Sequence, residues 1–155
     1  MNFACVCYGN KYSIEYVQKL YNMVQRHTTL EHNFFIFTDN MEMEIDGHVN
    51  IRTFPMVNLQ GWWNKMQLFH PGILEGTTLY MDLDVVITDN IDCFFTYEPE
   101  ADFVGMNDFN PDTKIFNSSV FRFEPEAMKD KLWQPFINDR ERWLRYSGDQ
   151  NVISE

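Results

Sequence analysis

An apolar strand, an amphipathic helix and a second apolar strand follow one another at the start of the sequence, and this order constrains the fold most. Residues 3–8 are apolar and rich in strand formers, and the pattern breaks at Gly9. Ser13 suits the N-cap of a helix whose apolar side chains recur at helical spacing as far as about His27. Residues 34–37 form the second apolar run. A strand, a helix and a strand in this order favour a parallel sheet with helices packed on it.

The rest of the chain continues this alternation. Strands are expected at residues 50–54, 77–81, 102–106 and 118–123, and helices at 62–69, 126–137, 140–146 and from Asp149 onward. The chain of 155 residues has no repeat and no stretch of linker composition. We therefore predict one domain over residues 1–155, of the α/β class, with a mostly parallel sheet sandwiched by helices.

The charge of the chain limits its ligands. Asp and Glu number 23 against 12 Lys and Arg, which gives a formal net charge of -11. Affinity for nucleic acid comes largely from Lys and Arg against phosphates, so this charge argues against a nucleic-acid partner. It argues equally against binding to an anionic membrane surface. A phosphorylated ligand would need a cation to mediate its binding.

The sequence also bears on location. No run approaches the roughly 18 apolar residues of a membrane span, and the N-terminus lacks the basic region of a signal peptide. Cys5 and Cys7 stand at strand spacing on one face, where a mutual disulfide would be strained. We therefore expect these two thiols and Cys93 to be free and buried in the protein interior. Free thiols are typical of a reducing compartment, so we expect the protein to be cytoplasmic.

The most informative motif is Asp82-Leu83-Asp84, which follows a predicted buried strand. In an extended backbone, side chains two residues apart share a face, so both carboxylates can point the same way. Two bare carboxylates 4 Å apart repel by about 4 kcal/mol at an effective dielectric near 20. A divalent cation between them, Mg²⁺ or Mn²⁺, would remove this repulsion and could hold a diphosphate. The alternative is an acidic loop in which Asp84 caps a turn.

Other polar residues near the predicted strand ends each have two interpretations. Lys65 stands among apolar positions, where it could reach a phosphate or extend its charge to the surface. The adjacent Trp62 and Trp63 could belong to the core or form a ligand platform. Asn117 and Ser118 suit sugar hydroxyls, but they also suit a turn. Asp149 and Gln150 follow a glycine, and they could bind a ligand or cap a helix.

The order of these pieces carries a resemblance to a known family. The motifs, in chain order, are Cys5-Val6-Cys7-Tyr8-Gly9, Phe37-Thr38-Asp39, Trp63-Asn64-Lys65, Leu79-Tyr80-Met81-Asp82-Leu83-Asp84, Phe116-Asn117-Ser118-Ser119-Val120 and Gly148-Asp149-Gln150. The ordered set resembles the glycosyltransferases of the GT-A fold, particularly the family 8-like branch and related bacterial sugar transferases. The resemblance covers nearly the whole chain.

This resemblance implies a metal-dependent transferase that uses a nucleotide-sugar donor, usually UDP-linked, with Mn²⁺ or Mg²⁺ as cofactor. Asp82 and Asp84 would hold the metal, and Asp149 and Gln150 would be catalytic. The residues implied for donor binding are Tyr8, Gly9, Tyr12, Asp39, Lys65, Asp82, Asn117 and Ser118. The acceptor, whether saccharide, lipid or protein, is not indicated, and the aromatic content near the C-terminus leaves self-association open.

The sequence departs from the family pattern at its end. Family 8-like enzymes add a third metal ligand, typically a histidine, well after the Asp-Gln segment, whereas this chain stops five residues after Gln150. We therefore expect a shortened member with a weaker, wetter metal site. One alternative is a non-catalytic nucleotide-sugar-binding or assembly module of the same fold. Another alternative is a haloacid-dehalogenase-like phosphatase, because residues 82–86 resemble the aspartyl nucleophile motif of that family. That family carries the motif near the N-terminus, which argues against it here.

Overall fold

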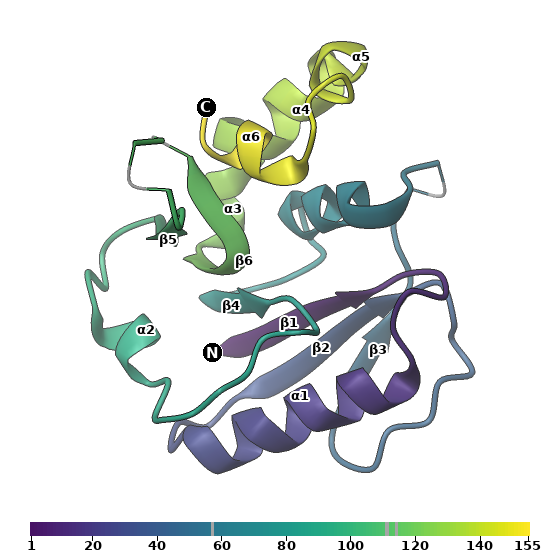
Figure 1. Ribbon diagram of the computed structural model, residues 1–155, viewed down its shortest axis with the longest axis vertical. Helices are drawn as coiled ribbons and strands as arrows, with labels where there is room; N and C mark the ends of the chain where they lie inside the picture. Colours follow the sequence, from purple (N-terminus) through teal and green to yellow (C-terminus); the bar gives the residue numbers. More distant parts are fainter. Residues whose placement is uncertain (57, 111, 114) are drawn as a thin grey trace.

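The computed structural model describes residues 1–56, 58–110, 112–113 and 115–155, and these build one six-stranded sheet (Figure 1). The strands lie in the order β3-β2-β1-β4-β6-β5. Their bounds are β1 Asn2–Cys7, β2 Asn33–Thr38, β3 Asn50–Arg52, β4 Thr78–Met81, β5 Phe103–Asn107 and β6 Phe116–Phe123. The helices are α1 Ile14–His27, η1 Gly61–Phe69, α2 Cys93–Thr96, α3 Pro125–Met128, η2 Lys129–Trp133, α4 Gln134–Asn138, α5 Arg140–Trp143 and α6 Asp149–Ile153.

The predicted strand–helix–strand unit forms the centre of the fold. β1 pairs in parallel with β2 on one side and with β4 on the other, and β2 pairs in parallel with β3. The helix that connects β1 to β2 begins directly after its N-cap Ser13, as the sequence predicts. The carboxyl ends of β1, β2 and β4 therefore meet at one edge of the sheet, where ligands bind in open α/β folds.

One strand runs against the others, and its direction matters for the site. β6 is antiparallel to both β4 and β5, so the other five strands run the same way and the sheet is mostly parallel. The reversal brings the start of β6 beside the end of β4, where Met81 pairs with Val120. Directly beyond this pair, the backbone N–H of Asp82 donates to the carbonyl of Ser119 at 2.8 Å.

Helices cover both faces of the sheet, and each face has its own apolar cluster. On one face, Val17 and Leu20 of α1 pack with Phe3 and Cys5 of β1. The opposite cluster contains buried side chains of η1 and the C-terminal helices, including Met66, Phe69, Trp133, Phe136 and Val152. Figure 1 shows α1 on one side of the sheet and η1 with the C-terminal helices on the other. The predicted α/β sandwich is confirmed.

The three cysteines are free, but they differ in burial. Cys5 and Cys7 are buried on the same face of β1, as predicted. Burial raises the pKa of the Cys5 thiol, so this group stays protonated at neutral pH. Cys93 is exposed, which corrects the expectation that all three thiols are buried. It begins α2, a short helix that the sequence pattern does not reveal.

The C-terminal helical region is more irregular than predicted. Instead of one helix over residues 126–137, α3 passes through the π-helical turn η2 into α4. Pro135 explains the wider turn, because proline has no N–H to donate and its ring displaces the carbonyl four residues earlier. η1 is a 3₁₀ helix. Within the described residues, no helix has the length and apolarity needed to span a bilayer.

A fully buried arginine fastens α2 and the turn after it to the sheet. Arg122, in β6, donates to the carbonyls of Phe94 at 3.0 Å, Tyr97 at 2.7 Å, Glu98 at 2.6 Å and Ala101 at 3.0 Å. The guanidinium thus provides donors to four carbonyls of the segment from 94 to 101. The same strand carries the site residue Ser118 at its other end.

We predict that Arg122→Met lowers the free energy of unfolding by about 3 kcal/mol, because four backbone carbonyls lose the donor that a fully buried guanidinium provides. Urea denaturation followed by circular dichroism measures this loss. Arg145→Met, which changes a solvent-exposed arginine, is the control and should change stability by less than about 0.5 kcal/mol. Equal midpoints for the two variants would contradict the role assigned to Arg122.

Asp92 joins the end of α1 to the loop before α2. The Thr28 hydroxyl donates to Oδ1 at 2.5 Å and the Thr29 hydroxyl donates to Oδ2 at 2.7 Å. These hydrogen bonds, with a further one from Asn90, hold the pKa of Asp92 at about 2. Since the folded pKa is depressed, the carboxylate stabilises the fold above the ordinary Asp pKa of about 3.9, and this contribution is lost as pH falls toward 2.

We therefore predict that Asp92→Asn is less stable than the wild type at pH 6 and that the difference shrinks at pH 2.5. Urea midpoints at the two pH values measure it. Asp130→Asn, at an exposed position, is the control and should show no such narrowing. A difference that is the same at both pH values would contradict the proposed origin of the depressed pKa.

Candidate functional site

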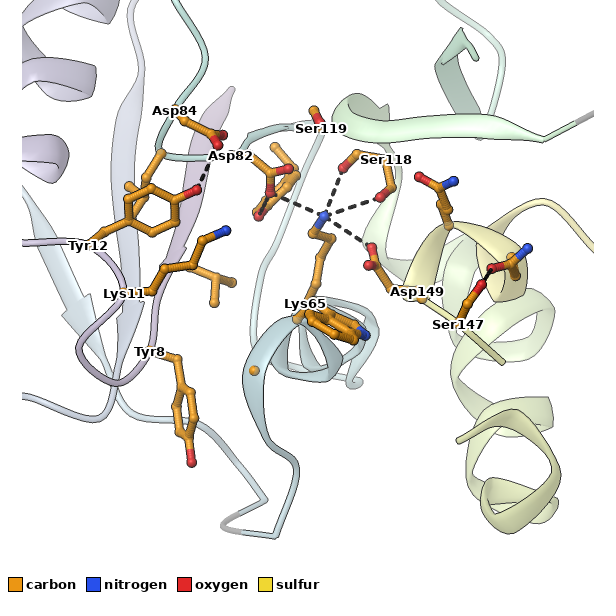
Figure 2. A pocket seen from close by; sticks show the side chains of 18 residues that line it. Tyr8, Lys11, Tyr12, Lys65, Asp82, Asp84, Ser118, Ser119, Ser147 and Asp149 are labelled. Carbon is orange, nitrogen blue, oxygen red and sulfur yellow. Dashed lines mark hydrogen bonds and ion pairs between the residues drawn. The ribbon is translucent and has the colours of Figure 1, made fainter. Parts of the chain in front are cut away.

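A cavity of about 570 Å³ opens at the carboxyl ends of β1 and β4 (Figure 2). Five segments line it: the β1–α1 loop, the start of η1, the turn after β4, the start of β6 and the start of α6. The antiparallel direction of β6 is the reason that its first residues reach this edge. The side chains that supply polar groups are Tyr8, Lys11, Tyr12, Lys65, Asp82, Asp84, Ser118, Ser119, Ser147, Asp149, Gln150 and Asn151.

Lys65 is the centre of the cavity floor, and it is only 5% exposed. Its Nζ lies 3.1 Å from Oδ1 of Asp82 and 3.0 Å from Oδ2 of Asp149. It also donates to the carbonyl oxygen of Ser118 at 3.0 Å and to the hydroxyl of Ser118 at 3.2 Å. One ammonium group therefore joins the turn after β4, the strand β6 and the helix α6, and the alternative in which Lys65 extends its charge to the surface is wrong.

The two carboxylates beside Lys65 are bound differently. Asp82 Oδ1 also accepts a hydrogen bond from the Tyr80 hydroxyl. Burial raises the pKa of Tyr80 well above its usual range, and the charge of Asp82 adds to this. Asp149 Oδ2 has no aligned hydrogen-bond donor within the described residues, so its contact with Lys65 is a simple ion pair. Asp149 is the first residue of α6, and Gly148 occupies the N-cap position, so Asp149 does not cap the helix.

The acidic motif lies on a turn. β4 ends at Met81, and the backbone N–H of Val85 donates to the carbonyl of Asp82 at 3.2 Å. This corrects the extended backbone expected for residues 82–84. The turn gives the two carboxylates different partners, since Asp82 contacts Lys65 whereas Asp84 accepts from the Tyr12 hydroxyl at 2.6 Å (Figure 2). Both still line the same cavity.

Two residues of the β1–α1 loop form the wall beside Asp84. The Lys11 ammonium lies 4.6 Å from the centre of the Tyr12 ring. The side chain of Tyr12, followed by the charges of Asp84 and Asp82, raises the pKa of Lys11. Desolvation and the hydrogen bond to Asp84 raise the pKa of the Tyr12 phenol, so it remains a donor at neutral pH. Lys11 is therefore positive and Asp84 is hydrogen-bonded.

A second cavity, of about 480 Å³, lies between the ends of β1 and β2 and the start of α1. Gly9 donates its backbone N–H to both carboxylate oxygens of Asp39 at 3.2 Å. Its φ of 66° lies in the left-handed region, which favours glycine at this position. Tyr12 lines both cavities and so stands at the boundary between them.

The structure brings most of the predicted site residues together. Eight of them line the larger cavity: Tyr8, Tyr12, Lys65, Asp82, Asp84, Ser118, Asp149 and Gln150. Gly9 and Asp39 line the smaller one. Asn117 lines neither cavity, and its Oδ1 accepts from the backbone N–H of Ser119 at 3.0 Å, which is the turn role considered for it.

Sequence reasoning did not assign functions to Lys11, Ser119 and Asn151, which also line the larger cavity, and it preferred a core position for the tryptophan pair. Lys11 lies in the segment after β1 that contains Tyr8 and Tyr12, so its position in the sequence could have indicated that it lines the site. Trp62 is 58% exposed on the cavity rim, whereas Trp63 stacks on Phe136 in the core. The 3₁₀ geometry of η1 explains why the two tryptophans differ. Residues three apart share a face of such a helix, so Trp62 lies on the same face as Lys65, toward the cavity.

The donor atoms suit a divalent cation only in part. Asp82 Oδ2 and Asp84 Oδ1 make no hydrogen bond or ion pair within the described residues, so each aspartate retains one oxygen for a metal. In the same part of the chain, no group of three or more His, Cys, Asp or Glu side chains could hold a metal ion. Two carboxylates match a Mg²⁺ or Mn²⁺ site whose other ligands are water and substrate phosphate.

No protein-family model matches the chain, and no curated protein matches its sequence. Solved structures do match the fold. The galactosyltransferase LgtC in complex with donor and acceptor sugar analogues superposes with a TM-score of 0.71 and 14% identity, over 99% of this chain and 69% of LgtC. The glycosyltransferase GlyE of Streptococcus pneumoniae TIGR4 superposes with a TM-score of 0.68 and 12% sequence identity, over 97% of this chain and 42% of GlyE. The chain has the GT-A glycosyltransferase fold.

An active-site glutamine-to-glutamate mutant of LgtC superposes with a TM-score of 0.69. At 12 to 14% identity, these likenesses concern the GT-A fold. The predicted fold and the resemblance that led to it are thus confirmed at the level of architecture. The chain spans 42% of the length of GlyE, so the activity of such a larger protein is a matter for proposal.

We predict that Lys65→Met lowers the free energy of unfolding by about 3 kcal/mol, because the buried carboxylate of Asp149 and the partly buried one of Asp82 lose their cation. Chemical denaturation measures the loss, and hydrogen exchange should show faster opening of α6. Lys131→Met removes an exposed ion pair with Asp102 and should cost less than about 1 kcal/mol. If both variants lost equally little, Lys65 would not join the elements as described.

Proposed function

We propose that this chain is a glycosyltransferase that transfers a sugar from a nucleoside diphosphate sugar, with UDP as the expected nucleotide. The support is the GT-A fold together with a cavity at the sheet edge where such folds bind ligands. LgtC, which has the same fold, was solved with donor and acceptor sugar analogues. The acceptor of the present chain is a hydroxyl-bearing molecule that the structure does not specify further.

The observation that carries the proposal is the convergence of two acidic segments distant in sequence. Asp82 and Asp149 are held 3.1 Å and 3.0 Å from the same ammonium, that of Lys65. Asp84 and Gln150 line the same cavity. The carboxylates of Asp82 and Asp84, which we propose as metal ligands, and the carboxylate–amide pair of Asp149 and Gln150 thus lie around one cavity of about 570 Å³.

The donor can be assigned to the two cavities by chemistry. Gly9, Tyr12 and Asp39 would line the nucleoside in the smaller cavity, with Tyr8 beside it. The diphosphate would cross the boundary at Tyr12. Ser118, Asp149 and Gln150 would face the transferred sugar in the larger cavity. Lys65 supports the sugar site by orienting Asp82 and Asp149, since its ammonium is already surrounded by protein acceptors.

Asp82 and Asp84 would hold Mn²⁺ or Mg²⁺ through the carboxylate oxygens that make no other contact within the described residues. Such a cation neutralises the negative charge that develops on a leaving diphosphate. In the transfer, the bond between the anomeric carbon and the diphosphate oxygen breaks, a bond to the acceptor oxygen forms, and the proton of the acceptor hydroxyl passes to the departing diphosphate. Asp149 and Gln150 are the residues positioned to orient the sugar during this exchange.

A non-catalytic nucleotide-sugar-binding module is the second candidate. It is favoured by one observation, the ion pairing of both Asp82 and Asp149 with the ammonium of Lys65, which leaves neither carboxylate an isolated base. Binding without turnover is the property that separates this candidate from an enzyme.

We predict that a UDP-sugar raises the melting temperature in the presence of Mn²⁺, and that incubation releases the nucleotide. UDP-, GDP- and TDP-linked sugars are compared with Mn²⁺ and with EDTA, by thermal shift and by chromatography of the nucleotide. A shift without release would indicate the binding module. The absence of a shift with every donor would overturn both candidates.

The metal assignment has its own test. Asp84→Asn should abolish the part of the thermal shift that depends on Mn²⁺ while the melting temperature without ligand stays near that of the wild type. Asp46→Asn removes an equal charge from an exposed loop position and should leave the shift unchanged. An Asp84→Asn protein with the full Mn²⁺-dependent shift would exclude Asp84 as a metal ligand.

A further inference from the structure

Two ammonium groups line the larger cavity, and only one of them is engaged by protein anions. Lys65 has four oxygen acceptors within 3.2 Å, belonging to Asp82, Asp149 and Ser118. Two of these contacts are hydrogen bonds to Ser118, and the other two are ion pairs with Asp82 and Asp149, so four protein oxygens already surround this ammonium. A phosphate oxygen could approach Lys65 only by displacing a contact that holds the site together.

Lys11 is in the opposite situation. Its side chain is exposed, and within the described residues its Nζ makes no ion pair with a carboxylate. Its described contact is with the ring of Tyr12, at 4.6 Å from the centroid. Figure 2 shows the ammonium directed into the cavity, on the side of Tyr12 and Asp84 that faces Asp82. Lys11 thus supplies a positive charge that is paired with no carboxylate of the described residues.

The charge balance of the cavity indicates what that ligand requires. Two ammonium groups and three carboxylates, those of Asp82, Asp84 and Asp149, leave the lining with one net negative charge. A bound divalent cation would reverse this to one net positive charge. If Lys11 were neutral, the loaded cavity would have no net charge, although a nucleoside diphosphate carries at least two negative charges. The positive character of the loaded site thus depends on Lys11.

We propose that Lys11 is a diphosphate-binding residue, which contacts the donor where it passes from the nucleoside cavity to the sugar cavity. This inference rests on the proposed function. Tyr12 lines both cavities, and Lys11 lies against its ring, so a ligand that spans the two must pass this ammonium. Lysine binds phosphate as a point charge on a flexible stem and needs no fixed geometry to do so. The role that the sequence assigned to Lys65 therefore passes to Lys11.

The test compares UDP with uridine, because only UDP carries the group that Lys11 is proposed to bind. Isothermal titration in the presence of Mn²⁺ gives both affinities for the wild type and for Lys11→Gln. We expect Lys11→Gln to weaken UDP binding about tenfold, the loss that corresponds to one charge-assisted hydrogen bond, and to leave uridine binding unchanged. Lys11→Arg should restore most of the affinity. The difference for UDP should shrink as salt screens the charge.

Lys19→Gln is the matched control, since Lys19 is an exposed lysine on α1 whose ion pair is with Glu15. It should bind UDP like the wild type. UDP binding by Lys11→Gln equal to that of the wild type would overturn the role of Lys11 alone, as would an equal loss for uridine. A wild-type protein that binds neither UDP, GDP nor TDP would overturn the proposed function, and the role of Lys11 with it.

Discussion

The buried ammonium of Lys65 is the interaction on which the candidate site depends. It compensates two carboxylates that would otherwise repel each other, and it binds both oxygens of Ser118. Removing one partner of such a buried cluster leaves an unpaired charge, which is far more costly than the cluster's net contribution to folding. The cluster thus fixes the positions of three chain segments through one atom. Placing it correctly requires the antiparallel β6, because only that direction brings Ser118 to the end of β4.

The site contains two ammonium groups, one surrounded by protein oxygens and one that makes no ion pair within the described residues. Lys65 is enclosed and already surrounded by acceptors, whereas Lys11 is exposed beside Tyr12. Lys65 fixes the positions of the side chains around it, whereas Lys11 can contact a ligand. This division explains how a chain with a net charge of -11 can present a site for a phosphorylated molecule. The charge at the sheet edge, where Lys11 and Lys65 both line the larger cavity, matters more for such a ligand than the total charge of the chain.

Local patterns predicted much of this architecture. The strand–helix–strand unit, the N-cap Ser13 and the convergence of residues at strand ends all follow from periodicity and turn chemistry, which are properties of neighbouring residues. The partners of Lys65 could not be predicted in this way. Ser118 stands 53 residues further along the chain, and nothing near Lys65 in sequence indicates which acceptors will surround it. A turn at residues 82–84 was considered only as the alternative to an extended backbone, because the apolar residues 85–87 prolong the apolar pattern of the strand before it.

The resemblance to GT-A glycosyltransferases located residues that periodicity alone left ambiguous, notably Asp149 and Gln150. It did not distinguish two kinds of lysine, because a motif records residue types and not the number of acceptors around each one. Asn117 illustrates the same limit. Its neighbour Ser118 lines the cavity, but the Asn117 side chain accepts a hydrogen bond from the backbone N–H of Ser119.

The position of Asp149 also has a consequence for the order in which the protein becomes functional. During synthesis, the central strands and α1 can associate before α6 exists, because their pairings involve residues up to 81. Lys65 then faces Asp82 without its second carboxylate. The site therefore needs residues 118 and 149 to be in place, whereas the pairings of β1 with β2 and β4 lie within the first 81 residues.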